Sequence, residues 1–178
     1  MRTLITIILI FSLSAGSAQI TKMVLIKNQS FKMIGVQHDE PVEKETKVFG
    51  VKVDYETGEI NGVVNLVELD LLNKERESSA DPEMDALRIQ GFLPLDDIVF
   101  NQQQQRAYTV ELEMKIKDFT VPVLFNFNIA YIKNTRSNFH DVRANAVVNL
   151  HDFNVEDLNG FEPEVNIILM FQMINLQR

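Results

Sequence analysis

Apolar and polar positions alternate without exception along residues 108–116, which read YTVELEMKI. The apolar positions are Tyr108, Val110, Leu112, Met114 and Ile116. After a break at residues 117–119, the alternation resumes over residues 121–131. A period of two residues predicts β-strands with one buried face and one solvated face. Two such strands joined by a short polar segment predict an antiparallel hairpin.

Other apolar patterns predict further strands on both sides of this hairpin. They cover residues 23–26, 31–36, 49–55, 60–71, 140–150 and 164–176. Residues 37–47 are charged and are expected to form a loop. Residues 167–171 are apolar at every position, so we expect this strand to be covered on both faces, for instance by a helix on its outer side. About eight long antiparallel strands favour a barrel, and a two-sheet sandwich is the competing architecture.

One short helix is predicted over residues 82–90. Pro82 suits the first helical position, and Gly91 suits the position just after the helix. Phe92 is then expected to face inward. Residues 93–106, which contain a run of four glutamines, are expected to form a polar loop.

Residues 1–18 have the three parts of a secretory signal peptide. A positively charged start is followed by ten apolar residues at positions 4–13, and Gly16 and Ala18 suit a cleavage site before residue 19. Ten residues are too few to span the hydrocarbon core of a bilayer, which is about 30 Å thick. We therefore expect a periplasmic or secreted protein without an integral membrane span, in which residues 19–178 form a single domain.

Charge and cysteine content exclude several classes of function. The 178-residue chain carries a formal net charge of −8, which argues against a nucleic-acid partner. It contains no cysteine, so disulfides, thiolate metal sites and cysteine nucleophiles are excluded.

No catalytic or metal-binding set emerges from the titratable residues. His140 and His151 lie eleven positions apart, near the two ends of one predicted strand, so their side chains should point to opposite faces and cannot share a metal. The acidic pairs fall in predicted loops. We therefore predict no catalytic residue, no metal, no cofactor and no enzymatic activity.

The candidate binding surface is the apolar face of the predicted strands. Its nine members are Phe49, Val51, Tyr108, Val110, Leu112, Phe125, Phe127, Phe171 and Met173. An eight-stranded barrel is the size at which side chains either fill the interior or leave room for one ligand. The pattern alone leaves both interpretations open, a packed core and a lumen that holds a ligand.

Several segments resemble motifs of the YceI-like family of exported bacterial lipid-binding proteins. The best local match is residues 114–123 (MKIKDFTVPV), which are similar to the family's L-x-I-x-G-x-T-x-P-V hairpin. Residues 149–155 (NLHDFNV) are similar to its N-R-x-D-F-G-I segment. Residues 57–71 resemble its hairpin before a charged helix, and residues 82–93 resemble that helix. The resemblance covers roughly residues 45–176.

The resemblance implies an all-β, lipocalin-like extended antiparallel β-barrel of about eight strands with one short helix. Its lumen would hold a long-chain apolar lipid, a polyisoprenoid such as a polyprenyl quinone, for storage or transport. Phe125, Phe127 and Phe171 would form the wall, and Tyr108 or Tyr131 would offer a polar handle.

Two other functions compete with lipid binding. One is a structural or interaction protein of the cell envelope, with a packed barrel core and an exposed apolar patch near Ile168 and Met170. The other is an enzyme that uses carboxylates at the barrel mouth. The sequence also leaves open whether the protein is a monomer or a homodimer.

Overall fold

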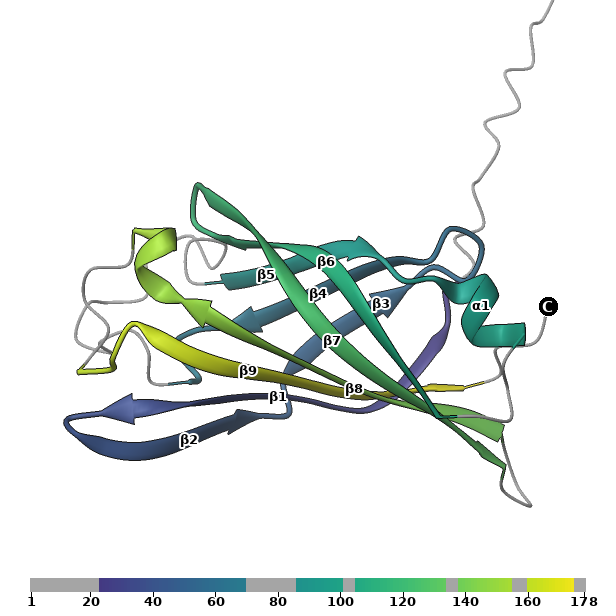
Figure 1. Ribbon diagram of the computed structural model, residues 1–178, viewed down its shortest axis with the longest axis horizontal. Helices are drawn as coiled ribbons and strands as arrows, with labels where there is room; N and C mark the ends of the chain where they lie inside the picture. Colours follow the sequence, from purple (N-terminus) through teal and green to yellow (C-terminus); the bar gives the residue numbers. More distant parts are fainter. Residues whose placement is uncertain (1–22, 70–85, 101–104, 134–137, 155–159, 175–178) are drawn as a thin grey trace, which may run out of the picture.

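The computed structural model describes residues 23–69, 86–100, 105–133, 138–154 and 160–174, and the predicted signal peptide lies outside them. This part of the chain forms nine strands in one antiparallel sheet, in the order β2-β1-β9-β8-β7-β6-β5-β4-β3 (Figure 1). The strands are β1 (Leu25–Gln37), β2 (Glu40–Thr46), β3 (Phe49–Val53), β4 (Glu59–Asn65), β5 (Ala86–Phe92), β6 (Arg106–Ile116), β7 (Phe119–Lys133), β8 (Asn138–Asn149) and β9 (Glu164–Ile174). The described helices are α1 (Leu95–Phe100) and the 3-10 helix η1 (Leu150–Phe153).

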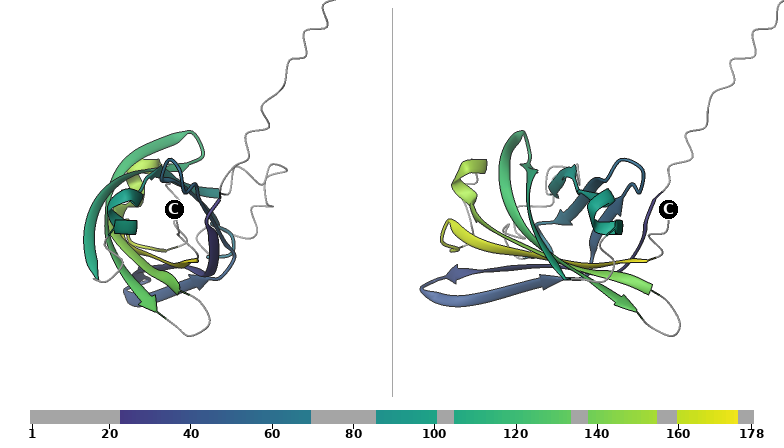
Figure 2. Two further views of the ribbon diagram at one scale, coloured as in Figure 1. Left: turned by 90° about the vertical axis from the view of Figure 1, so that its right-hand side faces the viewer. Right: turned by 45° about the vertical axis from the view of Figure 1, so that its right-hand side comes forward.

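The sheet curls into a barrel, which Figure 2 shows end-on. Strands β1 and β3 are distant in the sheet order, yet they meet on the far side of the curl. There the N–H of Val24 donates to the carbonyl oxygen of Val53, with N and O 2.8 Å apart. The rings of Phe31 and Phe49 pack edge to face with their centroids 5.9 Å apart. The core cluster lies inside this curl, and the predicted barrel is confirmed.

The predicted central hairpin is confirmed as β6 and β7. Ile116 pairs with Phe119, so the turn consists of Lys117 and Asp118 alone. Lys117 adopts a left-handed conformation, with φ 52°. Because apolar residues recur at every second position of both strands, pairing them places most large apolar side chains of the hairpin on one side of the sheet, whereas Leu124 and Ile132 lie on the other.

The predicted helix over residues 82–90 is wrong where the structure describes it. Residues Ala86–Phe92 form strand β5, which pairs with both β4 and β6. Gly91 does not end a helix. A Cβ there would come within 2.6 Å of the Leu112 side chain, so the absence of a side chain at Gly91 leaves room for Leu112 of β6. Phe92 points outward and is 64% exposed, contrary to the expectation.

The observed helix α1 lies in the segment that was expected to be a loop. Two acidic residues, Asp96 and Asp97, occupy its first turn, where the positive end of the helix dipole favours them. Leu95 and Ile98 are buried in the core cluster. The helix therefore packs against the end of the barrel at the right of Figure 1.

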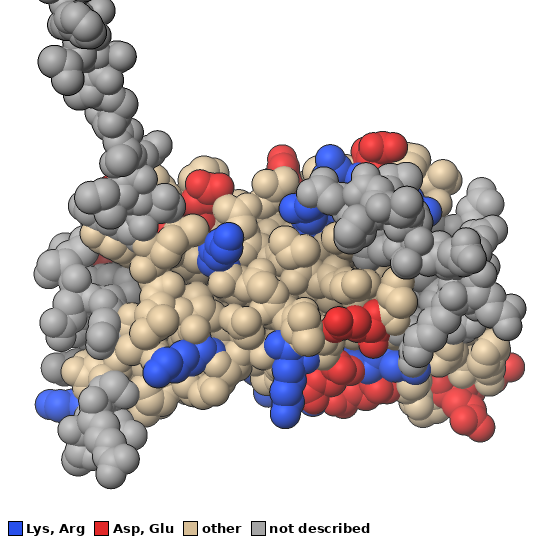
Figure 3. Space-filling view, turned by 180° about the vertical axis from the view of Figure 1, so that it is seen from behind, with Lys and Arg blue, Asp and Glu red and all other residues tan. Residues whose placement is uncertain are grey.

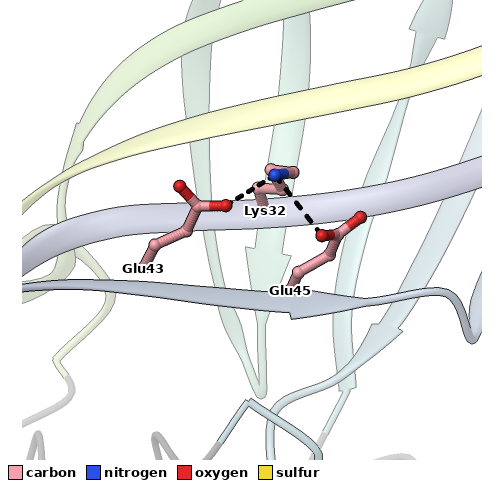
Figure 4. Close-up of polar contacts among 3 residues, drawn as sticks. All are labelled: Lys32, Glu43 and Glu45. Carbon is pink, nitrogen blue, oxygen red and sulfur yellow. Dashed lines mark hydrogen bonds and ion pairs between the residues drawn. The ribbon is translucent and has the colours of Figure 1, made fainter.

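The expected loop at residues 37–47 is also wrong, because most of it is strand β2. This strand pairs only with β1 in the sheet order and is therefore an edge. Glu43 and Glu45 form an ion-pair network with Lys32 of β1, at N–O distances of 2.5 and 3.3 Å (Figure 4). Charged residues and proline protect an exposed edge from pairing with another chain, and the same composition is typical of a loop.

The outer side of β9 is covered, as expected, but not by the helix. Ile168 of β9 is only 6% exposed, so its outward side is covered, but α1 lies at the barrel end and not over β9 (Figure 1).

Acidic and basic side chains are interspersed on the face shown in Figure 3, around an uncharged central area. Among the described residues, neither helix has the length and apolar character needed to cross a membrane.

Candidate functional site

The nine residues predicted to line the interior come together in or against one apolar cluster. Seven of them belong to the buried core, namely Phe49, Val51, Leu112, Phe125, Phe127, Phe171 and Met173. The other two, Tyr108 and Val110, are partly buried and pack against that core. The structure therefore groups the predicted residues, and their contact with a ligand stays a prediction.

The middle of the interior is covered by the chain's own atoms. Leu112 and Phe125 are fully buried, and Phe127 is 1% exposed. The rings of Phe125 and Phe127 lie with their centroids 6.3 Å apart. Side chains buried to this degree leave no water-sized space beside them. A ligand at this level would have to displace side chains.

Strand β8 contributes the smallest side chains of the inner face. Ala144 and Ala146 are at most 2% exposed. The register places Ala144 between Phe127 of β7 and Leu169 of β9. Each alanine leaves volume that a larger neighbour fills, which is how large and small residues interdigitate in a barrel interior.

The interior is less tightly covered toward the end that carries α1. Here Tyr108 and Val110 of β6 keep part of their surface exposed. The pKa of the Tyr108 phenol is raised, first by burial and then by a hydrogen bond to Asp97 of α1. Arg106 also contacts Asp97, with a guanidinium N–O distance of 3.7 Å. Polar groups of β6 and α1 therefore meet at this end of the barrel.

A second polar feature at this end is His140, which sequence reasoning did not assign to the interior. The register aligns Tyr131, His140, Met173 and Ile26 across β7, β8, β9 and β1. His140 is 3% exposed, and its ring centroid lies 5.2 Å from that of Tyr131. The signal was present in the sequence, because His140 shares the parity of the buried residues of β8, among them Val142.

The described residues contain no group of three or more His, Asp or Glu side chains that could hold a metal ion. His140 is buried in the sheet, whereas His151 is exposed on η1, which lies at the opposite end of the barrel from α1 (Figure 1). The two histidines are therefore far apart in the fold.

The apolar patch expected near Ile168 and Met170 is not exposed. Ile168 is buried and Met170 is half-buried. Large exposed apolar side chains lie elsewhere on the outer surface, at Phe92, Leu124 and Val147, which are 64%, 59% and 63% exposed.

Comparison with solved structures shows the fold. The chain is similar to a polyisoprenoid-binding domain from Saccharophagus degradans implicated in plant cell wall breakdown, with a TM-score of 0.63 and 10% identity over 86% of this chain and 99% of that domain. It is also similar to BcnA from Burkholderia cenocepacia, with a TM-score of 0.52 and 15% identity over 81% of this chain and 95% of that one. No protein-family model matches the sequence, and no curated protein gives a significant match. The shared fold confirms the predicted lipocalin-like barrel.

Proposed function

We propose that this protein is an exported member of the YceI-like family that holds a long apolar lipid of the polyisoprenoid type inside its barrel, for storage or transport. The observation that carries the proposal is the continuous apolar inner face, which runs from β3 through β6 and β7 to β9. The proposal assigns no catalytic step to the protein. Its export rests on the signal-peptide pattern of residues 1–18.

Two further observations support lipid binding. A solved structure with this fold is a polyisoprenoid-binding domain, and the match covers 99% of it. The inner face also offers rings and a thioether, at Phe127, Phe171 and Met173, against which a branched unsaturated chain packs well. Burial of such a chain contributes about 0.8 kcal/mol per CH₂ group.

One observation favours the second candidate, an envelope interaction protein with a packed core. Seven of the nine predicted lining residues are buried by the chain itself. Exposed apolar side chains on the outer surface, such as Leu124 and Val147, would then contact a partner. The two candidates differ in where the ligand or partner contacts the protein, inside the barrel or outside it.

Organic extraction of the purified protein, followed by mass spectrometry, tests the leading proposal. The protein should be expressed with its own signal sequence and purified without detergent. A polyprenyl species at a stoichiometry near one per chain is the expected result. If only trace lipid is extracted, and protein incubated with polyprenol vesicles takes up none, the proposal is wrong.

A pair of variants distinguishes the interior from the outer surface. Ala144→Leu adds three carbon atoms to a fully buried inward position, whereas Val147→Leu adds one carbon atom to an outward position that is 63% exposed. The proposal expects Ala144→Leu to reduce the bound lipid and Val147→Leu to leave it unchanged. The reverse pattern would favour binding on the outer surface.

A further inference from the structure

His140 carries an unusual combination of burial and unused hydrogen-bonding capacity. It is 3% exposed, and neither Nδ1 nor Nε2 has a hydrogen-bond partner within the part of the chain that the structure describes. Its neighbours along the inner face are Tyr131 on β7, Met173 on β9 and Ile26 on β1. The ring therefore lies on the apolar inner wall near the end of the barrel that carries α1.

An unpaired imidazole at this position costs stability. Leaving a buried polar group without a partner destabilises the folded state, whereas a phenylalanine or leucine in the same volume would not. Burial also lowers the pKa of His140, so the ring is neutral at neutral pH and presents one N–H donor and one acceptor nitrogen. An oxygen atom of a ligand that enters the interior would accept a hydrogen bond from the imidazole N–H.

The surroundings of His140 select against a charged group. None of its three neighbours across the strands, Tyr131, Met173 and Ile26, carries a charge. Arg106, at the same end of the barrel, is already in contact with Asp97. Lys133 lies one inward position beyond Tyr131 and is exposed. An anionic headgroup beside His140 would thus be buried without a cation, which is costly.

We propose that His140 binds the uncharged terminal oxygen, a hydroxyl or carbonyl, of the lipid in the barrel, and so sets the direction in which the lipid lies. The lipid's polar end then sits beside Tyr131 at the α1 end, and its apolar chain runs toward Phe127. This inference rests on the proposed function. It adds to that function the residue that binds the headgroup, the direction in which the lipid lies in the barrel, and the chemical class of the headgroup.

Binding of three probes to the mature protein tests the inference. Geranylgeraniol has a hydroxyl, squalene has no oxygen, and geranylgeranyl phosphate is anionic. Loss of the hydrogen bond in His140→Phe should weaken geranylgeraniol binding about tenfold and leave squalene binding unchanged, since tenfold corresponds to about 1.4 kcal/mol. Geranylgeranyl phosphate should bind the wild-type protein more weakly than the alcohol at neutral pH.

Two further variants separate binding from folding. His140→Gln keeps a donor and an acceptor and should recover part of the affinity for geranylgeraniol. His151→Phe makes the same change at the exposed histidine on η1 and should leave the binding of every probe unchanged. His140→Phe should be at least as stable to urea as the wild type, because it removes an unpaired polar group. A mainly structural role would instead lower its stability.

The outcomes separate this inference from the proposed function. If the wild-type protein binds none of the probes, both are wrong. If it binds the alcohol and squalene, and His140→Phe retains the alcohol or loses both equally, only the role of His140 is wrong. If the phosphate binds more tightly than the alcohol, the uncharged headgroup is wrong.

Discussion

Replacing Phe127 with alanine tests whether side chains fill the interior of the lipid-free barrel. Phe127 is 1% exposed and lies between Tyr108 of β6 and Ala144 of β8 in the sheet register. Its ring also packs beside Phe125. The strands around it are held by hydrogen bonds on both sides, so they can close only part of the space left by the ring.

The magnitude follows from burial and from the remaining cavity. Burying a phenylalanine side chain contributes about 1.5–3 kcal/mol through removal of apolar surface from water. An incompletely closed cavity adds to this, and Phe→Ala changes in packed cores cost about 3–5 kcal/mol. We expect Phe127→Ala to lower the free energy of unfolding by about 4 kcal/mol. The matched control, Leu124→Ala, lies on the outward side of the same strand at 59% exposure and should cost about 0.5 kcal/mol or less.

Urea unfolding followed by circular dichroism suits this protein, because the chain has no tryptophan. The lipid-extracted protein and both variants should show two-state transitions with similar m-values. A cost below about 1 kcal/mol for Phe127→Ala would mean that the ring borders open space. That result would refute the packed interior and leave a preformed lumen in its place.

Three further predictions concern other parts of the chain. Burial lowers the pKa of His140, so between that value and the ordinary value of about 6.5 the unfolded chain binds more protons than the folded one. The free energy of unfolding should therefore decrease as the pH falls below about 6.5, more steeply in the wild type than in His140→Phe, and parallel urea data would contradict this. Gly58 has φ +78°, and a Cβ there would lie 2.3 Å from the Leu93 carbonyl oxygen, so Gly58→Ala should cost about 2 kcal/mol or more in urea unfolding. Gly50→Ala, where the nearest atom is 4.0 Å away, is the control and should cost far less. Hydrogen bonds to two glutamates raise the pKa of Lys32, and Lys32→Gln should shift the urea midpoint slightly at low salt and not at about 1 M salt.

The parts of the fold that could be predicted are those with an uninterrupted local pattern. Strands β6, β7 and β8 alternate over most of their length, because each has one face on the core and one in solvent. The positive φ of Gly58 follows from its place in a short turn between two strands, where glycine is favoured. These features depend on residues that are near one another in the chain.

The failures come from segments whose structure depends on distant partners. Residues 86–92 contain inward Leu87 and Ile89 at strand spacing, but Pro82 and Gly91 suggested a helix. Pairing with β4 and β6 on both sides decides the conformation there. Strand β2 was missed for a different reason, because the residues that protect a sheet edge are also those of a loop.

The same distinction applies to the candidate site. Membership of the inner face follows from parity, so all nine predicted residues fall in or against one cluster. Whether they border a ligand or each other depends on how closely opposite walls approach. The lack of a hydrogen-bond partner for His140 likewise depends on its neighbours on other strands, Tyr131 and Met173. No local sequence pattern encodes these neighbours.

A filled interior and a lipid-binding function impose a route of entry. In the middle of the barrel, a lipid must replace contacts among Leu112, Phe125 and Phe127. Transfer of one CH₂ group from water to an apolar environment contributes about 0.8 kcal/mol, and each lipid CH₂ group buried there contributes less than this to the binding free energy. At the α1 end the exchange is more favourable, because Tyr108 still has exposed surface and His140 has unused hydrogen-bonding capacity. Binding should therefore begin at that end, and the polar terminus should stay there while the chain displaces the aromatic side chains deeper inside.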